Sequence, residues 1–168
     1  MRLLSSLLFL IALSVIPLMA VEKSVHKKLP LSQSLPLLAT IEGDALHLGT
    51  GERKIYLFVD PLCPHSQDFM DLIANNEKLL LRNNYNIYLY TLKRLHSENT
   101  VTSIYMSKDP MQALVDVMIK KSKINIKVQP SQEVRSKIVA IEHVAEKLDV
   151  YKRPYLILTK KPKKKRGK

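Results

Sequence analysis

The chain has 168 residues, a length typical of one domain, and its formal net charge is +12. Seven basic residues lie in residues 160–168 and another, Arg2, lies near the N-terminus, which leaves only +4 for the rest. The high isoelectric point is therefore mostly a property of a C-terminal basic tail. The single cysteine, Cys63, excludes a domain stapled by internal disulfides.

Residues 1–20 have the pattern of a secretory signal peptide. Arg2 supplies a short charged region, residues 3–18 are almost wholly apolar, and Leu-Met-Ala at 18–20 is an acceptable cleavage site. We therefore expect export, by default to a bacterial periplasm. The alternative is an uncleaved anchor in the inner membrane, although the apolar run is short for a span and Pro17 interrupts it.

The first half of the exported chain predicts two strands, a helix and a third strand. Residues 21–40 indicate an irregular lead-in, and a turn at residues 49–52 predicts a hairpin between strands at 46–48 and 54–59. A helix is predicted from Pro64 to about Arg82, where Asn83 and Asn84 would break it. Residues 86–92 alternate apolar and polar types, which predicts a strand parallel to 55–59 in a βαβ unit.

The second half predicts three helices and a last strand. Ser97 begins a short helix that reaches Ser107, and Asp109 before Pro110 is a helix start signal. Ser131 begins another helix, and residues 155–158 form the last strand. The alternation predicts an α/β domain over residues 41–159 with a largely parallel sheet.

Cys63 lies where a strand changes into a helix. Residues 55–59 are an apolar run typical of a buried strand, Asp60 and Pro61 end it, and Pro64 suits a first helical position. A helix N-terminus favours an anion, and a thiolate is one. A lone cysteine in an exported protein is either buried and inert or a reactive thiol, and this loop position favours the reactive thiol.

Three segments resemble the periplasmic disulfide isomerases of the DsbC/DsbG type. Residues 58–66, Phe-Val-Asp-Pro-Leu-Cys-Pro-His-Ser, resemble that family's active-site segment, and residues 105–118 resemble its inserted helices. Arg153-Pro154-Tyr155 resembles its cis-proline loop. The resemblance covers residues 41–158. It implies a thioredoxin-like fold, with a central mixed sheet flanked by helices, and a substrate-binding role for Pro154 and Arg153.

The chain departs from the family pattern in several places. Ser66 occupies the position of the family's second active-site cysteine, and Arg153 replaces the usual threonine before the cis-proline. The sequence after residue 158 is a lysine-rich tail where the fold normally adds a strand and a helix, so we expect a shortened C-terminus. The region before residue 50 looks too short for the family's N-terminal dimerisation domain.

These features predict a thiol protein that works through Cys63 alone, with His65 and Ser66 helping to hold the thiolate. One thiolate suffices for disulfide isomerisation, whereas dithiol reduction needs a resolving thiol. The alternative is a non-catalytic binding or chaperone module with a vestigial site. We expect no cofactor, no metal and no nucleic acid. The expected partners are cysteine-containing exported proteins and a membrane redox partner, and the tail could touch anionic lipid.

Overall fold

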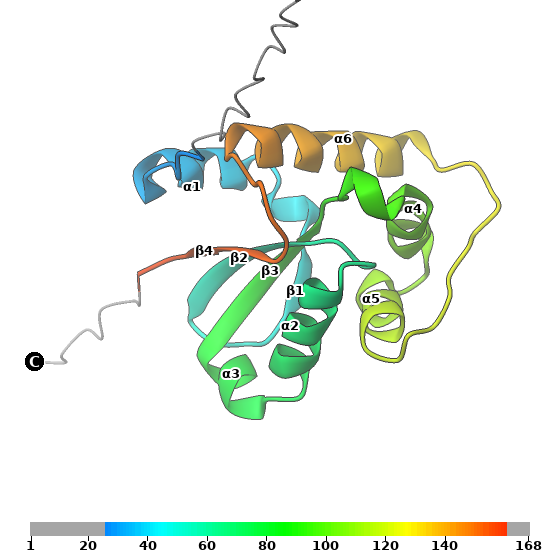
Figure 1. The fold of residues 1–168 in the computed structure, drawn as a ribbon. Helices are drawn as coiled ribbons and strands as arrows, with labels where there is room; N and C mark the ends of the chain where they lie inside the picture. Colours follow the sequence, from blue (N-terminus) through cyan, green and yellow to red (C-terminus); the bar gives the residue numbers. More distant parts are fainter. Residues whose placement is uncertain (1–25, 161–168) are drawn as a thin grey trace, which may run out of the picture.

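The computed structural model describes residues 26–160 (Figure 1), so the predicted signal peptide at residues 1–20 and the tail from residue 161 onward lie outside it. The described chain forms a four-stranded sheet with helices on both faces, in the strand order β1-β3-β2-β4. The strands are β1 (Leu46–Leu48), β2 (Arg53–Val59), β3 (Asn83–Leu89) and β4 (Tyr155–Leu158).

The two central strands, β2 and β3, are parallel, while β1 and β4 run antiparallel to their neighbours. Leu57 in β2 lies opposite Ile87 in β3 and Leu156 in β4, and Leu57 and Ile87 are fully buried. The sheet is thus mixed, as the family resemblance implies. The expectation of a largely parallel sheet is wrong, because only the central pair follows a crossover helix.

The predicted hairpin between β1 and β2 does not form, because β1 pairs with β3 instead. The turn at residues 49–51 packs against the start of β3, where Gly51 N donates to Asn83 O at 3.1 Å. Gly49 has a φ of 87°, and a Cβ on Gly51 would lie 2.0 Å from the carbonyl carbon of Arg82. Only glycine permits this close approach, and the turn leads the chain past β3 to its far side.

The helix that follows Cys63 is shorter than predicted. It divides into α2 (Pro64–Ala74) and α3 (Glu77–Arg82). Asn76 caps α3, because its Oδ1 accepts the Leu79 N–H at 3.1 Å. Asn83 ends the helical segment after Arg82, as expected, but it also begins β3, so this strand lies at 83–89 and not at 86–92. The sequence analysis did not predict the interruption between α2 and α3 at Asn75 and Asn76.

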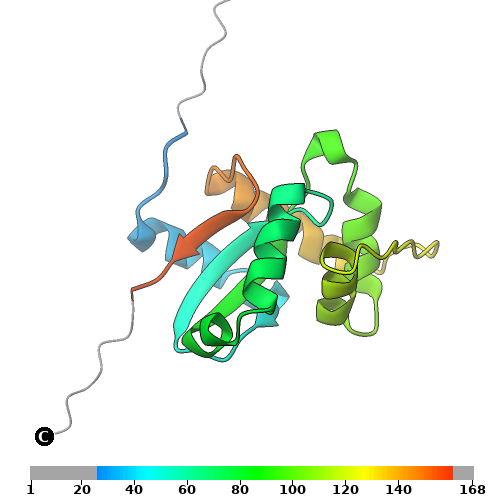
Figure 2. The same cartoon turned by 60° about the horizontal axis from the view of Figure 1, so that its bottom comes forward.

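The later helices form as predicted: α4 (Glu98–Met106), α5 (Pro110–Met118) and α6 (Gln132–Lys147). Asp109 caps α5 by accepting the Gln112 N–H at 3.0 Å, and Ser131 caps α6 by accepting the Val134 N–H at 3.2 Å. Figure 2 shows α4 and α5 as a unit at the side of the sheet. The helical insertion is therefore confirmed.

The expected irregular lead-in is wrong for its second half, which forms helix α1 (Leu31–Ala39). Leu38 is fully buried in the core, and the Ser34 hydroxyl donates to Pro30 O at 3.1 Å. In Figures 1 and 2, α1 and α6 lie on one face of the sheet, whereas α2 and α3 lie on the other. The proline inside α1, Pro36, made this segment appear irregular because helix interiors disfavour proline.

Candidate functional site

Cys63 lies where the sequence predicts, immediately past the carboxyl end of β2 and at the N-cap of α2, with Pro64 as the first helical residue. Its N–H donates to Asp60 O at 3.0 Å, which closes the turn between strand and helix. The Cys63 side chain is only 1% exposed, and its Sγ lies 3.8 Å from the carbonyl oxygen of Arg153. The thiol is thus enclosed between the start of α2 and the loop before β4.

That loop contains a cis peptide bond between Arg153 and Pro154, as predicted. The bond lies 90 residues away from Cys63 in sequence, yet the fold brings the two together because β4 pairs with β2. The backbone carbonyl of Arg153 faces the thiol, and Pro154 is half-buried beside it. The two segments predicted to form one site therefore do so.

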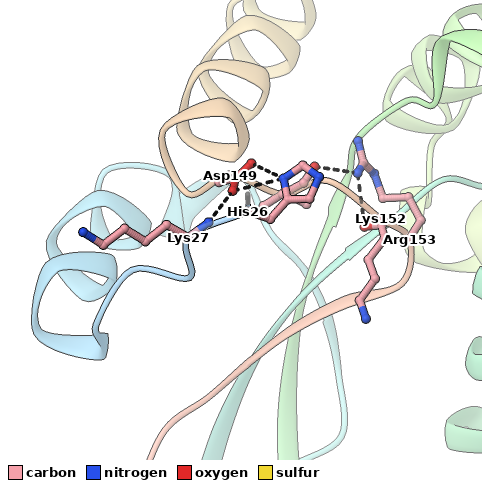
Figure 3. Close-up of polar contacts among 6 residues, drawn as sticks. His26, Lys27, Asp149, Lys152 and Arg153 are labelled. Atoms are coloured by element: carbon pink, nitrogen blue, oxygen red, sulfur yellow. Dashed lines mark hydrogen bonds and ion pairs between the residues drawn. The ribbon is translucent and has the colours of Figure 1, made fainter. Parts of the chain in front are cut away.

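The Arg153 side chain is buried, and Figure 3 shows its contacts with the segment that follows Asp149. It is 7% exposed, and its guanidinium donates to Tyr90 O at 2.8 Å, Val150 O at 2.9 Å and Thr91 O at 3.1 Å. The guanidinium carbon also lies 3.7 Å from the centre of the Tyr90 ring. Arg153 thus ties the cis-proline loop to the end of β3.

Burial lowers the pKa of the Arg153 guanidinium, and the nearby Tyr90, Asp60 and Cys63 oppose that shift. An arginine remains charged despite such burial, because its ordinary pKa is far above neutral. The loop before β4 therefore carries a buried cation, the charge of which Asp60 and Cys63 favour.

Asp60 is a buried carboxylate that the sequence analysis treated only as a strand terminator. Its oxygens accept from Leu62 N at 2.8 Å, Leu92 N at 2.5 Å and the Ser97 hydroxyl at 2.6 Å. These bonds join the loop before Cys63 to the segment after β3 and to the start of α4. The sequence did hold a signal for this role, because an acidic residue directly after a buried strand lies near the core. A buried carboxylate requires hydrogen-bond partners, so Asp60 could have been predicted to join neighbouring segments.

Ser66 is buried in the first turn of α2, whereas His65 lies at the surface. Ser66 is fully buried, and its Oγ accepts the Asp60 N–H at 3.4 Å. Within residues 26–160 no hydrogen bond joins Ser66 to the Cys63 sulfur, and the His65 side chain is exposed. The structure thus places the Arg153 backbone against Cys63 and the Ser66 hydroxyl against the Asp60 backbone.

No group of three or more His, Cys, Asp or Glu side chains in residues 26–160 is arranged to hold a metal ion. In the same range, no helix has the length and apolar character needed to cross a membrane.

Several solved structures share this architecture at low sequence identity. Helicobacter pylori DsbG has a TM-score of 0.58 at 16% identity, covering 76% of this chain and 61% of DsbG. The catalytic domain of Proteus mirabilis ScsC has a TM-score of 0.59 at 15% identity, covering 75% of this chain and 85% of that domain. For a disulfide interchange protein of Neisseria gonorrhoeae the TM-score is 0.53 at 17% identity, covering 68% and 79%.

No protein-family model matches the chain, and no curated protein matches it. The evidence for the fold is therefore structural. A mixed four-stranded sheet, helices on both faces, an inserted helical unit and the similarity to DsbG and ScsC together show that this chain has a thioredoxin-like fold.

Proposed function

We propose that this protein is an exported thiol–disulfide exchange protein that acts through Cys63 alone. It would isomerise the disulfides of other exported proteins or hold those proteins as mixed disulfides. The observation that carries the proposal is the placement of Cys63 at the N-terminus of α2, with its Sγ 3.8 Å from the carbonyl oxygen that precedes the cis-proline. Helix N-termini stabilise anions, and thiolate is the reacting form of cysteine.

The reaction needs no external oxidant or reductant. The Cys63 thiolate attacks one sulfur of a substrate disulfide, forming a new S–S bond, and the substrate's other sulfur leaves as a thiolate with the electron pair of the broken bond. A different substrate thiolate then attacks the mixed disulfide on the substrate sulfur. This second exchange forms the rearranged substrate disulfide and returns the Cys63 thiolate.

The identity of residue 66 limits the protein to this one-thiol chemistry. A dithiol reductase releases its substrate by attack of its own second cysteine, and the hydroxyl of Ser66 cannot form that disulfide. The lifetime of a mixed disulfide would therefore depend on thiols of the substrate or of another molecule. Slow release would make the protein a mixed-disulfide holder, and fast release would make it an isomerase.

The half-buried Pro154 supports a way to position the substrate. The family resemblance implies that the cis-proline loop pairs with an extended substrate segment. Here Pro154 is half-buried while Cys63 is enclosed, so a bound segment would have to displace the cover over the thiol. We propose that backbone pairing at this loop precedes exposure of the Cys63 sulfur.

The burial of Cys63 also favours a second candidate, a non-catalytic binding or chaperone module with a vestigial thiol. A thiol that is 1% exposed and directed at a backbone carbonyl is placed as an inert core residue could be. In that case the surface beside Pro154 would still bind unfolded chains, but Cys63 would be dispensable.

An isomerisation assay separates the two candidates. Ribonuclease A with scrambled disulfides regains activity only if its disulfides rearrange, so the rate of regain measures isomerisation by the wild type and by Cys63→Ser. We expect the wild type to accelerate the regain and Cys63→Ser to lose the effect. The binding-module candidate predicts instead that both proteins leave this rate unchanged and suppress aggregation of the reduced substrate equally.

We also propose a periplasmic setting, which rests on the signal-peptide pattern of residues 1–20. The basic residues 160–168 would attract the chain to anionic lipid, where a membrane redox partner could keep Cys63 reduced. Release of the protein from cells by selective disruption of the outer membrane tests this setting.

A further inference from the structure

A pocket of about 320 Å³ lies on the outer side of the cis-proline loop, next to Cys63 but separate from it. Pro154 and Tyr155 line it, together with His26 and Lys28 from the segment before α1. Arg153 O is 3.8 Å from Cys63 Sγ and Pro154 follows directly, so a segment that pairs with the cis-proline loop, as the proposed function requires, would pass this pocket.

The aromatic wall of the pocket is preformed. The His26 ring stacks on Tyr151, with ring centres 3.9 Å apart and an interplanar angle of 9°. Tyr151 in turn meets Tyr155 edge-on, with ring centres 6.0 Å apart. Asp149 holds His26 in place, since its carboxylate lies 3.0 Å from Nδ1 of His26, and it also accepts the Lys27 N–H at 3.0 Å (Figure 3).

The pocket carries an excess of positive charge. Lys28 and Lys152 both line it and both are exposed, and none of the described residues that line it is acidic. Asp149, the acidic group beside it, is already occupied by His26 and the Lys27 backbone. Within residues 26–160, neither Lys28 nor Lys152 forms an ion pair. Lys152 Nζ lies 5.6 Å from the Tyr151 ring centre, which keeps this cation at the pocket.

We propose that this pocket selects substrates, by binding an acidic side chain of the polypeptide next to the cysteine presented to Cys63. The inference rests on the proposed function, which supplies the reason why a polypeptide passes Pro154. It adds the class of substrate: extended segments with Asp or Glu near the reacting cysteine. The two lysines, which pair with no acidic group of residues 26–160, complement one or two carboxylates. The aromatic wall accepts the apolar stem of a Glu side chain.

The test compares three fluorescent peptides that differ only in having Glu, Gln or Lys at the two positions beside an alkylated cysteine. They are titrated into full-length Cys63→Ser protein, which removes the exchange chemistry, and Kd is read from fluorescence anisotropy. The charge-reversed variant adds Lys28→Glu and Lys152→Glu. The control adds Lys78→Glu and Lys108→Glu, two exposed lysines that do not line the pocket, so both variants have the same net charge and the same basic tail.

We expect the Glu peptide to bind most tightly, and the pocket variant to weaken its binding about tenfold while strengthening that of the Lys peptide. Equal weakening by the control pair would overturn the proposal, because only net charge would then matter. Equal affinity for the Glu and Gln peptides would also overturn it. A matching urea midpoint for both variants confirms that the exposed substitutions leave the fold intact.

The two proposals fail separately. If the wild type does not isomerise scrambled ribonuclease A but the Glu peptide still depends on Lys28 and Lys152, the proposed chemistry is wrong and the pocket stands. If isomerisation depends on Cys63 while the peptides bind alike, the pocket proposal is wrong and the chemistry stands.

Discussion

Replacement of Arg153 by Met tests whether this side chain builds the site by fastening the cis-proline loop. The guanidinium is the donor to four backbone carbonyl oxygens, those of Tyr90, Thr91, Val150 and Lys152, at distances between 2.8 and 3.2 Å. It also stacks on the Tyr90 ring at 3.7 Å. Met has a comparable apolar stem but no donor, so all four carbonyls lose a charged partner.

The size of the effect follows from those contacts. A hydrogen bond to a charged group contributes about 1.5–3 kcal/mol, but these energies do not add, and water can reach most of the part-buried carbonyls around Arg153. We expect Arg153→Met to lower the free energy of unfolding by about 2–4 kcal/mol. Arg153→Lys keeps the charge but loses the planar fork, and we expect an intermediate loss.

Equilibrium urea unfolding measures the change, with Arg135→Met as the matched control. Arg135 is exposed on α6, and its replacement should change the free energy of unfolding by no more than about 0.5 kcal/mol. If Arg153→Met cost no more than this control, Arg153 would not be fastening the loop to the end of β3.

Two further changes probe the residues around the site and on α6. Ser66→Cys should place a second cysteine one helical turn after Cys63, where the two can close a disulfide. This variant should reduce insulin in the presence of a thiol donor, whereas the wild type and Ser66→Ala should not. Equal activity in the wild type would contradict the one-thiol limit. Burial, together with Glu146 and Glu98, raises the pKa of Glu142. The folded state therefore holds the carboxyl proton of Glu142 more tightly than the unfolded state does. The free energy of unfolding should fall as the pH rises above 4.5, the ordinary pKa of this group. Glu142→Gln should therefore be more stable than the wild type at pH 7, by up to about 0.5 kcal/mol since the carboxyl is largely solvated. The difference in urea midpoint should vanish near pH 3.5, where Glu142 is protonated. A difference that persisted at low pH would show that the charge of Glu142 is not its cause.

The strand, turn and helix around Cys63 could be predicted from the sequence because their signals are local. An apolar run, Asp60 with Pro61, and Pro64 at the first helical position each act within a few residues. The cis bond at Pro154 was predicted from family resemblance, since cis bonds are a small minority of X–Pro bonds.

Features that depend on distant parts of the chain could not be predicted in the same way. The pairing of β1 with β3 depends on the close approach of Gly51 to the start of β3. The inward turn of Arg153 depends on carbonyls at the end of β3, more than 60 residues earlier, and nothing near Arg153 in the sequence indicates them. Two partners of Asp60 lie 32 and 37 residues later in the chain, on the segment after β3 and at the start of α4.

The central claim is that the enclosed thiol of Cys63 attacks disulfides while the protein is folded. Its most direct measurement is the rate at which the native full chain forms a mixed disulfide with a small disulfide-containing peptide, followed by intact mass, with Cys63→Ser as the blank. The account predicts an adduct of one peptide per chain that forms without denaturant and is released by an added thiol. An adduct that appeared only in concentrations of urea that unfold the protein would contradict it, and would show Cys63 to be a buried core residue.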